Sequence, residues 1–244
     1  MSDPRGTPKF EVVVPVYNEE RVLASSIDLL TAALARDFTV TWSVLIVDNG
    51  SVDRTSEVAN RLAAQHPGSV RVLHLDEKGR GRALRAAWLQ SQADVVAYTD
   101  VDLSTNLQHL PSLVQPLLDG RAHVATGNRL MRGAKVQRQL KREVVSRVYN
   151  LLVKLHFPRR RVTDMQCGFK ALTRQAAQQL VPLVRDQTWF FDTELLLRAE
   201  QLGYEVHQIP VEWIEDLDSR VNIARTAVDN MKGLWRVRTS PARA

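Results

Sequence analysis

Short apolar runs alternate along the chain with longer stretches in which apolar residues recur every three to four positions. The short runs predict strands and the longer stretches predict helices. Repetition of a strand followed by a helix is typical of an α/β domain with a mainly parallel sheet. The predicted strands cover residues 10–16, 42–47, 70–75, 94–99, 122–126, 166–173 and 205–213. Helices are predicted up to residue 34, from about 53 to 66, from about 80, and over 136–157, 193–202 and 222–238.

The composition favours one globular domain. Of the 244 residues, 44% are hydrophobic and 25% charged, which suffices to bury one sizeable core, and we find no internal repeat, low-complexity tract or linker. We therefore expect a single domain over 9–238, with flexible ends at 1–8 and 239–244. A lone cysteine, Cys167, excludes an internal disulfide and a cysteine-based zinc cluster.

Nothing at the start of the sequence looks like a signal peptide, and no apolar run approaches the roughly 18 residues of a membrane span. We accordingly expect a cytoplasmic protein. If a membrane is involved, the chain would visit its surface or rely on a separate membrane subunit.

The positive charge is concentrated in one stretch. The chain carries 33 Lys or Arg and 27 Asp or Glu, a net charge of +6, but residues 129–161 hold eleven basic residues against the single acid Glu143. The rest of the chain sums to −4. This distribution indicates a local anionic partner rather than general coating of nucleic acid.

Two carboxylates, Asp100 and Asp102, directly follow an apolar strand. Alternation along an extended chain turns both to one side, and ligands of open α/β sheets bind at the carboxyl ends of strands. Such oxygen ligands suit Mg²⁺ or Mn²⁺ beside phosphate oxygens. Taken alone, an Asp-x-Asp is better explained as a polar loop with a helix cap, but the preceding strand and the companion motifs below favour the metal site.

Two further segments carry candidate binding chemistry. Asp48 ends a predicted strand, where its carboxylate is suited either to the N–H edge of a base or to capping the next helix. The segment Lys78-Gly79-Arg80-Gly81 combines glycines with cations at a helix start, which suits a diphosphate, although a solvated charged loop explains it equally well.

Several motifs in order resemble those of family 2 glycosyltransferases with the GT-A fold, a Rossmann-like α/β fold, and in particular the polyprenyl- and dolichyl-phosphate hexosyltransferases, with dolichyl-phosphate β-glucosyltransferases and dolichol-phosphate mannose synthase among the relatives. The resemblance covers residues 9–238. It rests on Val14-Pro15-Val16-Tyr17-Asn18-Glu19-Glu20, Val47-Asp48-Asn49-Gly50-Ser51, Lys78-Gly79-Arg80-Gly81, Asp100-Val101-Asp102, Thr126-Gly127-Asn128-Arg129, Gln166-Cys167-Gly168-Phe169-Lys170, Trp189-Phe190-Phe191-Asp192-Thr193-Glu194 and Asp218-Ser219-Arg220.

The resemblance implies an inverting, metal-dependent enzyme that moves a hexose from a nucleotide sugar to a lipid-linked phosphate on the cytoplasmic face of a membrane. UDP-glucose is the favoured donor, GDP-mannose the alternative, and Mg²⁺ or Mn²⁺ the cofactor. Residues 9–126 would form the nucleotide-sugar half and 127–238 the acceptor half. The implied donor-binding residues are Pro15, Tyr17, Glu19, Asp48, Lys78, Asp100, Val101, Asp102 and Arg220, with Asp100 and Asp102 holding the metal.

Arg129 matches a family arginine between the donor and acceptor phosphates, and Arg142 and Ser146 lie in a segment resembling the one that grips the acceptor phosphate, with Gln166 as a further acceptor residue. The usual second Asp of the Asp-Asp-Gly-Ser motif is Asn49 here, so a carboxylate role at that position is not expected.

A phosphate monoester is already anionic near neutral pH and attacks without a general base, whereas a hydroxyl acceptor needs one. Asp192 and Glu194 are the available carboxylates. We place Asp192 in the catalytic set with Asp100, Asp102 and Arg129. For Asp192 we favour a role in orienting the acceptor or supporting the site over a role as general base.

Other functions remain open at this level. A glycosyltransferase of the same fold with a soluble hydroxyl acceptor would need Asp192 as base. A nucleotidyltransferase also uses a nucleotide, a metal and paired carboxylates. A nucleic-acid-binding module would use the basic stretch 129–161, which lacks interleaved aromatics and a groove-reading motif, so no nucleic-acid partner is expected.

The helix predicted over 136–157 has an apolar stripe beside its cations. Most such stripes face a protein core, but apolar residues flanked by cations are also suited to an anionic membrane surface. The stripe comprises Leu140, Val144, Val145, Val148, Leu151, Leu152 and Leu155.

Overall fold

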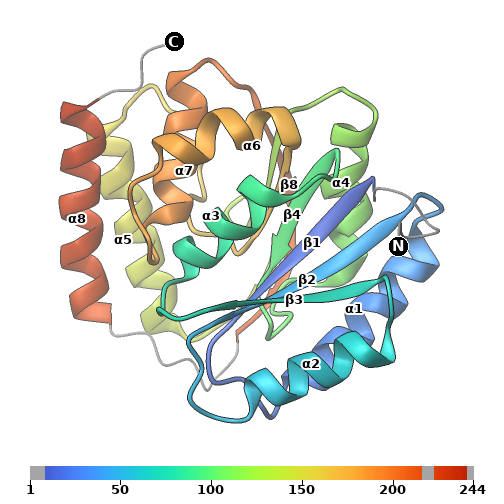
Figure 1. The fold of residues 1–244 in the computed structure, drawn as a ribbon. Coiled ribbons are helices and arrows are strands. Elements are labelled where there is room, and N and C mark those ends of the chain that lie inside the picture. The colour runs from blue at the N-terminus through green and yellow to red at the C-terminus, as the bar shows by residue number, and fades with distance from the viewer. Residues whose placement is uncertain (1–8, 216–222, 241–244) are drawn as a thin grey trace.

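A computed structural model describes residues 9–215 and 223–240, apart from the side chains of residues 140–142 and 223–225. Helices cover both faces of a central sheet (Figure 1). The sheet has seven strands in the order β3-β2-β1-β4-β7-β5-β8. These are β1 (Phe10–Val16), β2 (Trp42–Asn49), β3 (Val70–Leu75), β4 (Val95–Thr99), β5 (Val124–Asn128), β7 (Phe169–Thr173) and β8 (Val206–Pro210).

Strand β7 is antiparallel to both of its neighbours, β4 and β5, whereas the other neighbouring strands are parallel. The predicted α/β class with a mainly parallel sheet is confirmed. A second sheet pairs β6 (Lys135–Gln137) with β9 (Glu212–Ile214).

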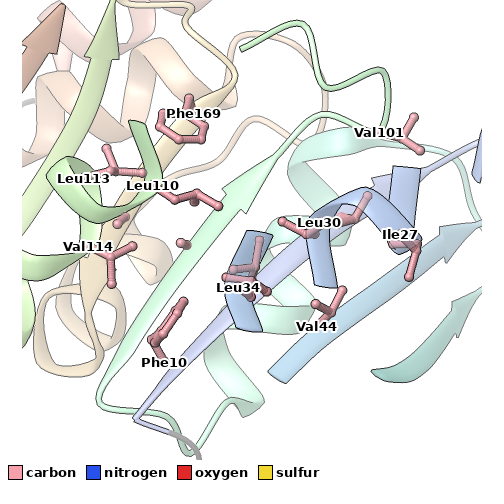
Figure 2. Packing of buried hydrophobic residues seen from close by; sticks show 14 of the residues in the cluster. Phe10, Ile27, Leu30, Leu34, Val44, Val101, Leu110, Leu113, Val114 and Phe169 are labelled. Carbon is pink, nitrogen blue, oxygen red and sulfur yellow. The ribbon is translucent and has the colours of Figure 1, made fainter. Parts of the chain in front are cut away.

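The residues of β1 alternate between two apolar clusters, one on each face of the sheet. Val12 and Val14 belong to the cluster under helices α1, α2 and α4, whereas Val13 belongs to the cluster under α3 and α5–α8. Figure 2 shows the first of these clusters, with Leu30 and Leu34 of α1 and Leu113 of α4 lying over the sheet. Because both faces are covered, every residue of β1 is buried, and all of them except Glu11 are apolar.

The helices that form these two layers lie between strands in chain order, except for α8, which follows the last strand. They are α1 (Leu23–Asp37), α2 (Thr55–Gln65), α3 (Arg80–Gln90), α4 (Leu110–Leu118), α5 (Leu140–His156), α6 (Arg174–Leu180), α7 (Phe191–Gln201) and α8 (Ile223–Thr239), with short 3₁₀ turns at Leu107–His109 and Val181–Leu183. In Figure 1, α5 and α8 lie side by side at the edge of the molecule, and they are in contact.

Several elements of the structure differ from those predicted. The single strand expected over 205–213 is split at Val211 into β8 and β9, which belong to different sheets. The helix expected from residue 136 begins at Leu140, because residues 135–137 pair with β9. Helix α4 was not predicted, since Pro111 and Pro116 interrupt its pattern, although Asn106 caps the turn before it and the apolar face of α4 packs on the sheet.

The boundary predicted between a nucleotide-sugar half and an acceptor half, at residues 126 and 127, falls inside β5 and stays a prediction. The ends predicted to be flexible, 1–8 and 239–244, lie outside the described residues except for Thr239 and Ser240.

Candidate functional site

The carboxyl ends of β1, β2 and β4 meet at one edge of the sheet because these strands are parallel and adjacent. Val16 at the end of β1 stands opposite Asp48 in β2. Asp100 follows β4 directly. The fold therefore brings three of the segments predicted to bind the donor, those that follow or end β1, β2 and β4, to a single edge, where open α/β sheets bind ligands.

Asp48 is buried at this edge. Its Oδ1 accepts a hydrogen bond from the backbone N–H of Ser51 at 3.1 Å, and its Oδ2 lies 3.4 Å from Nδ1 of His74 on β3. His74 is largely exposed and also contacts Asn60 and Ser56 through its ring nitrogens. The carboxylate is thus oriented by the turn after β2, with the His74 imidazole beside it.

Asn49 joins three segments of the site. Its Nδ2 donates to the carbonyl of Val16 at 2.5 Å, and its Oδ1 accepts from the backbone N–H of Gly79 at 2.8 Å. A carboxylate here would be unable to donate to Val16, so the departure from Asp-Asp-Gly-Ser has a structural reason. Asn49 therefore links the end of β1 to the start of α3.

Tyr17, directly after β1, contacts Lys78, which precedes α3. The Lys78 ammonium lies 3.7 Å from the centroid of the Tyr17 ring, a cation–π contact between two residues predicted to bind the donor. Lys78 is exposed. Pro15 is buried in β1, and Glu19 lies in the following turn, where its backbone N–H donates to Thr55.

Asp100, Val101 and Asp102 alternate as predicted. Val101 packs into the core, whereas the side chain of Asp100 is 36% exposed and Asp102 is exposed. The chain then turns sharply at Leu103, whose φ of 49° is in the left-handed region, and Asp102 Oδ1 accepts from the Ser104 N–H at 3.0 Å. Burial raises the pKa of Asp100, Arg80 lowers it, and Asp102 and Asp192 raise it again, to about 6.

The oxygen atoms at this edge suit a divalent cation that is coordinated both by the protein and by a phosphate. Asp100 and Asp102 supply carboxylate oxygens, and the residues described contain no group of three or more His, Cys, Asp or Glu suited to a metal. Two carboxylates leave coordination positions for diphosphate oxygens and water, which is how Mg²⁺ is commonly held. An added positive charge would also relieve the repulsion that raises the pKa of Asp100.

Asp192, at the start of α7, is 2% exposed and lies in a buried network of charges. It accepts a hydrogen bond from the Tyr98 hydroxyl and lies 3.0 Å from Lys170 Nζ and 3.2 Å from an Arg80 nitrogen. Burial opposes its ionisation, but Lys170, Arg80 and Tyr98 outweigh burial and hold its pKa below the usual range. This geometry argues against a catalytic role in which Asp192 takes a proton from the acceptor.

Glu194, two residues further along α7, is equally enclosed. It is fully buried, receives a hydrogen bond from Arg236 of α8 at 2.6 Å, and accepts from the backbone N–H of Asp186 at 3.0 Å. Both carboxylates of this segment therefore serve to hold α7 against its neighbours.

Arg129, after β5, is bound by a buried carboxylate that the sequence analysis missed. Its Nε and one terminal nitrogen contact the two oxygens of Asp164 at 2.7 and 2.9 Å, and its guanidinium stands over the Trp213 ring at 5.3 Å. Burial raises the pKa of Asp164, but Arg129 outweighs it and lowers the pKa to about 2. The signal for Asp164 was its position two residues before Gln166, in a stretch whose arginines need carboxylate partners when buried.

The other predicted acceptor residues lie near this pair or outside the description. The backbone N–H of Gln166 donates to Asp164, so Gln166 and Arg129 share one anchor. Ser146 lies on α5, half-buried. Arg142 is on the same helix, but its side chain lies outside the described residues, as does the whole of Arg220.

The described side chains of the apolar stripe on α5 are mostly exposed, and that of Leu140 lies outside the description. Tyr149 and Val153 face the core. Helix α8, which contacts α5, also carries exposed apolar residues, and Trp235 is 68% exposed. The exposed apolar face consists of Val144, Val145, Val148, Leu151 and Leu155 on α5 and Val228, Met231 and Trp235 on α8. No helix in the described ranges is both long and apolar enough to cross a membrane.

Comparison with known proteins gives consistent matches. The model of the family described as Glycosyl transferase family 2 matches residues 11–181. The glycosyltransferase AglD of Haloferax volcanii is 39% identical over 219 residues, 88% of this chain but 34% of its own length. The dolichyl-phosphate beta-glucosyltransferase ALG5C of Trichomonas vaginalis is 31% identical, with 93% of this chain and 73% of its own covered. The chain thus spans about a third of AglD.

A human dolichyl-phosphate beta-glucosyltransferase is 32% identical, covering 86% of this chain and 68% of its own. Among solved structures, glucosyl-3-phosphoglycerate synthase of Mycobacterium tuberculosis, in complex with UDP, superposes with a TM-score of 0.70 at 20% identity, covering 96% of this chain and 82% of that one. This likeness shows a shared fold, the GT-A fold that the sequence predicts.

Proposed function

Since the chain belongs to glycosyl transferase family 2, as predicted, we propose that it moves a hexose from a nucleotide sugar to the phosphate of a polyprenyl or dolichyl phosphate. Glucose from UDP-glucose is the favoured donor, in keeping with relatives named dolichyl-phosphate beta-glucosyltransferases, and GDP-mannose is the alternative. The whole activity, the donor and the acceptor are proposals for this chain, which spans about a third of AglD.

The observation that carries the proposal is the enclosure of the two acidic side chains that a hydroxyl acceptor would need. Asp192 and Glu194 are buried and ion-paired, so neither is placed to accept a proton from a substrate. An anionic phosphate acceptor needs no such base. The acceptor side then needs cations, which the stretch from 129 to 161 supplies in excess.

In the proposed mechanism, Asp48 orients the base of the nucleotide, and Tyr17 and Lys78 lie beside the nucleoside and diphosphate. Asp100 and Asp102 would hold Mg²⁺ or Mn²⁺, which when bound supplies positive charge to the departing diphosphate. Arg129, fixed by Asp164 and Trp213, would keep a positive charge between the donor and acceptor phosphates. Holding two mutually repelling anions in attack geometry is the main task of these side chains.

We further propose that the protein works at the cytoplasmic face of a membrane and docks through the exposed apolar face of α5 and α8. An anionic bilayer is the partner that this surface fits, because exposed cations flank the apolar side chains. They include Arg147 and Lys154 on α5 and Lys232 and Arg238 on α8. The test is sedimentation with vesicles of neutral or anionic lipid: Trp235→Ser with Leu155→Ser should lose binding to anionic vesicles, whereas Leu29→Ser, an equally exposed leucine on α1, should not.

The acceptor is tested by a matched pair of lipids. With UDP-glucose and Mn²⁺, the protein should glycosylate a short polyprenyl phosphate and leave the corresponding polyprenol, which lacks only the phosphate, unmodified. Glycosylation of the alcohol but not of the phosphate would establish a hydroxyl acceptor and overturn the proposal.

A further inference from the structure

Arg80 lies between the proposed metal site and the buried charges behind it. It is the first residue of α3, and its side chain is 13% exposed. One terminal nitrogen lies 3.3 Å from Asp100 Oδ1, 3.2 Å from Asp192 Oδ2 and 2.7 Å from the Tyr98 hydroxyl oxygen. The guanidinium therefore pairs with a proposed metal ligand on one side and with a buried carboxylate on the other.

The position of Arg80 is fixed by the packing of the glycines around it. A Cβ on Gly79 would lie 2.5 Å from the carbonyl oxygen of Gln187, and one on Gly81 would lie 2.7 Å from Cβ of Phe191. These glycines thus allow the start of α3 to pack closely against Gln187 and the start of α7, in addition to any role in binding a diphosphate. The rings of Tyr98 and Trp189 then lie 5.2 and 4.9 Å from the Arg80 guanidinium carbon.

The balance of charge in this network directs Arg80 toward Asp100. Asp192 is also paired with Lys170, which is fully buried, so the negative charge of Asp192 has a counter-ion of its own. Because the positive charge of Lys170 balances the negative charge of Asp192, the positive charge of Arg80 is left to balance that of Asp100. A cation arriving at Asp100 and Asp102 therefore meets a net charge of about −1 rather than −2.

We propose that Arg80 is a built-in counter-ion of Asp100 that makes metal binding depend on the nucleotide diphosphate. The inference rests on the proposed function, because it takes Asp100 and Asp102 as the metal ligands. Without nucleotide, the metal competes with Arg80 for Asp100 and binds weakly. The diphosphate adds negative charge and oxygen ligands, so metal and nucleotide bind together. Arg80 is a positioning residue, since it acts on the metal through Asp100.

The test measures Mn²⁺ affinity by titration calorimetry, with and without UDP, in the wild type, Arg80→Gln and Arg80→Lys. Arg80→Gln removes the charge and should bind Mn²⁺ alone about tenfold more tightly, equivalent to about 1.4 kcal/mol. Arg80→Lys keeps the charge and should stay close to the wild type. The gain in Mn²⁺ affinity on adding UDP should be smaller in Arg80→Gln, and by linkage so should the gain in UDP affinity on adding Mn²⁺.

Equal or weaker Mn²⁺ binding by Arg80→Gln, or the same shift in both variants, would overturn the counter-ion role, because lost packing affects both substitutions alike. If thermal unfolding shows that Arg80→Gln does not fold, Asp192→Asn replaces it. That variant removes the negative charge that Arg80 and Lys170 share, so more positive charge faces Asp100 and Mn²⁺ binding without UDP should weaken. Unchanged or tighter binding would contradict the inference.

Asp102→Asn separates this inference from the proposed metal site. If Asp102→Asn binds Mn²⁺ with UDP as tightly as the wild type, the metal site itself is misplaced and the proposed function fails. If Asp102→Asn weakens binding while Arg80→Gln does not tighten it, the metal site stands and only the role of Arg80 fails.

Discussion

Gly168 faces the carboxylate of Asp100, and its replacement by alanine tests the site without changing any proposed ligand. A Cβ at position 168 would lie 1.8 Å from Asp100 Oδ2 and 3.0 Å from an Arg80 nitrogen. Side-chain Cβ atoms essentially never approach another atom closer than 3.0 Å. The Asp100 carboxylate must therefore move by at least about 1.2 Å, or β7 must withdraw by a similar distance.

A shift of this size should be costly for activity and moderate for stability. Misplacing a reacting or binding group by about 1 Å can lower the rate about 100-fold, so we expect kcat/KM of Gly168→Ala to fall by about that factor. Overpacking in a buried position typically costs about 1–3 kcal/mol of unfolding free energy, which leaves a domain of this size folded. Mn²⁺ affinity in the presence of UDP should fall with the activity.

The assay pairs nucleotide-sugar turnover with urea unfolding of the same samples. Gly120→Ala is the control for lost stability, because Gly120 lies far from this edge, at a φ of 70° with open space around it, so alanine there costs about 1 kcal/mol of backbone strain and no contact. Gly120→Ala should keep its turnover. A folded Gly168→Ala with wild-type turnover and Mn²⁺ affinity would refute the placement of Asp100 in the site.

Three other predictions follow from buried contacts. Asn49→Asp should lose about 1–3 kcal/mol in urea unfolding, because it removes the donor to Val16 and buries a charge; a stability equal to the wild type would contradict the role of the Asn49 hydrogen bond to Val16. The pKa of Asp164 is lowered to about 2, below its unfolded value of about 3.9, so its stabilisation of about 2–3 kcal/mol is present above pH 4 and lost as the pH falls toward 2. Asp164→Asn should be less stable at neutral pH and flatten this acid limb, and an unchanged limb in circular dichroism would contradict the Arg129 pair. Burial raises the pKa of the Cys167 thiol to about 12, so iodoacetamide at pH 8 should label it only in urea; rapid labelling of the folded protein would show that it is accessible.

The central strands and the edge where the site lies could be predicted because they depend on local patterns. The apolar runs of β1, β2 and β4, and the carboxylates at their ends, can each be recognised from a segment of about ten residues. Their convergence follows from parallel pairing, a general property of βα units.

The partners of the charged side chains could not be predicted because they depend on distant packing. Arg80 and Asp192 are 112 positions apart along the chain, and Arg129 and Asp164 are 35 apart. The sequence suggested Asp192 as a catalytic residue and left the segment around Arg80 open between a diphosphate loop and a solvated charged loop. Only the docking of α7 against α3 reveals that Asp192 is buried and that Gly81 is small because of Phe191.

The apolar stripe of α5 marks a case in which the sequence left two interpretations open. Hydrophobic spacing alone does not tell a core-facing stripe from an exposed one. In the structure, Tyr149 and Val153 occupy the inner face, and Leu155 is 66% exposed. Knowing which neighbour covers a helix requires the tertiary structure.

The most direct test of the proposed function is identification of the product. The protein is incubated with Mn²⁺, UDP-glucose or GDP-mannose, and a short polyprenyl phosphate in anionic vesicles, and the lipids are analysed by mass spectrometry. The proposal predicts one new lipid, the polyprenyl phosphate carrying a single hexose, formed from UDP-glucose by the wild type and absent with Asp102→Ala. Transfer to water or to an alcohol with the polyprenyl phosphate left unchanged, or equal product formation by Asp102→Ala, would contradict it.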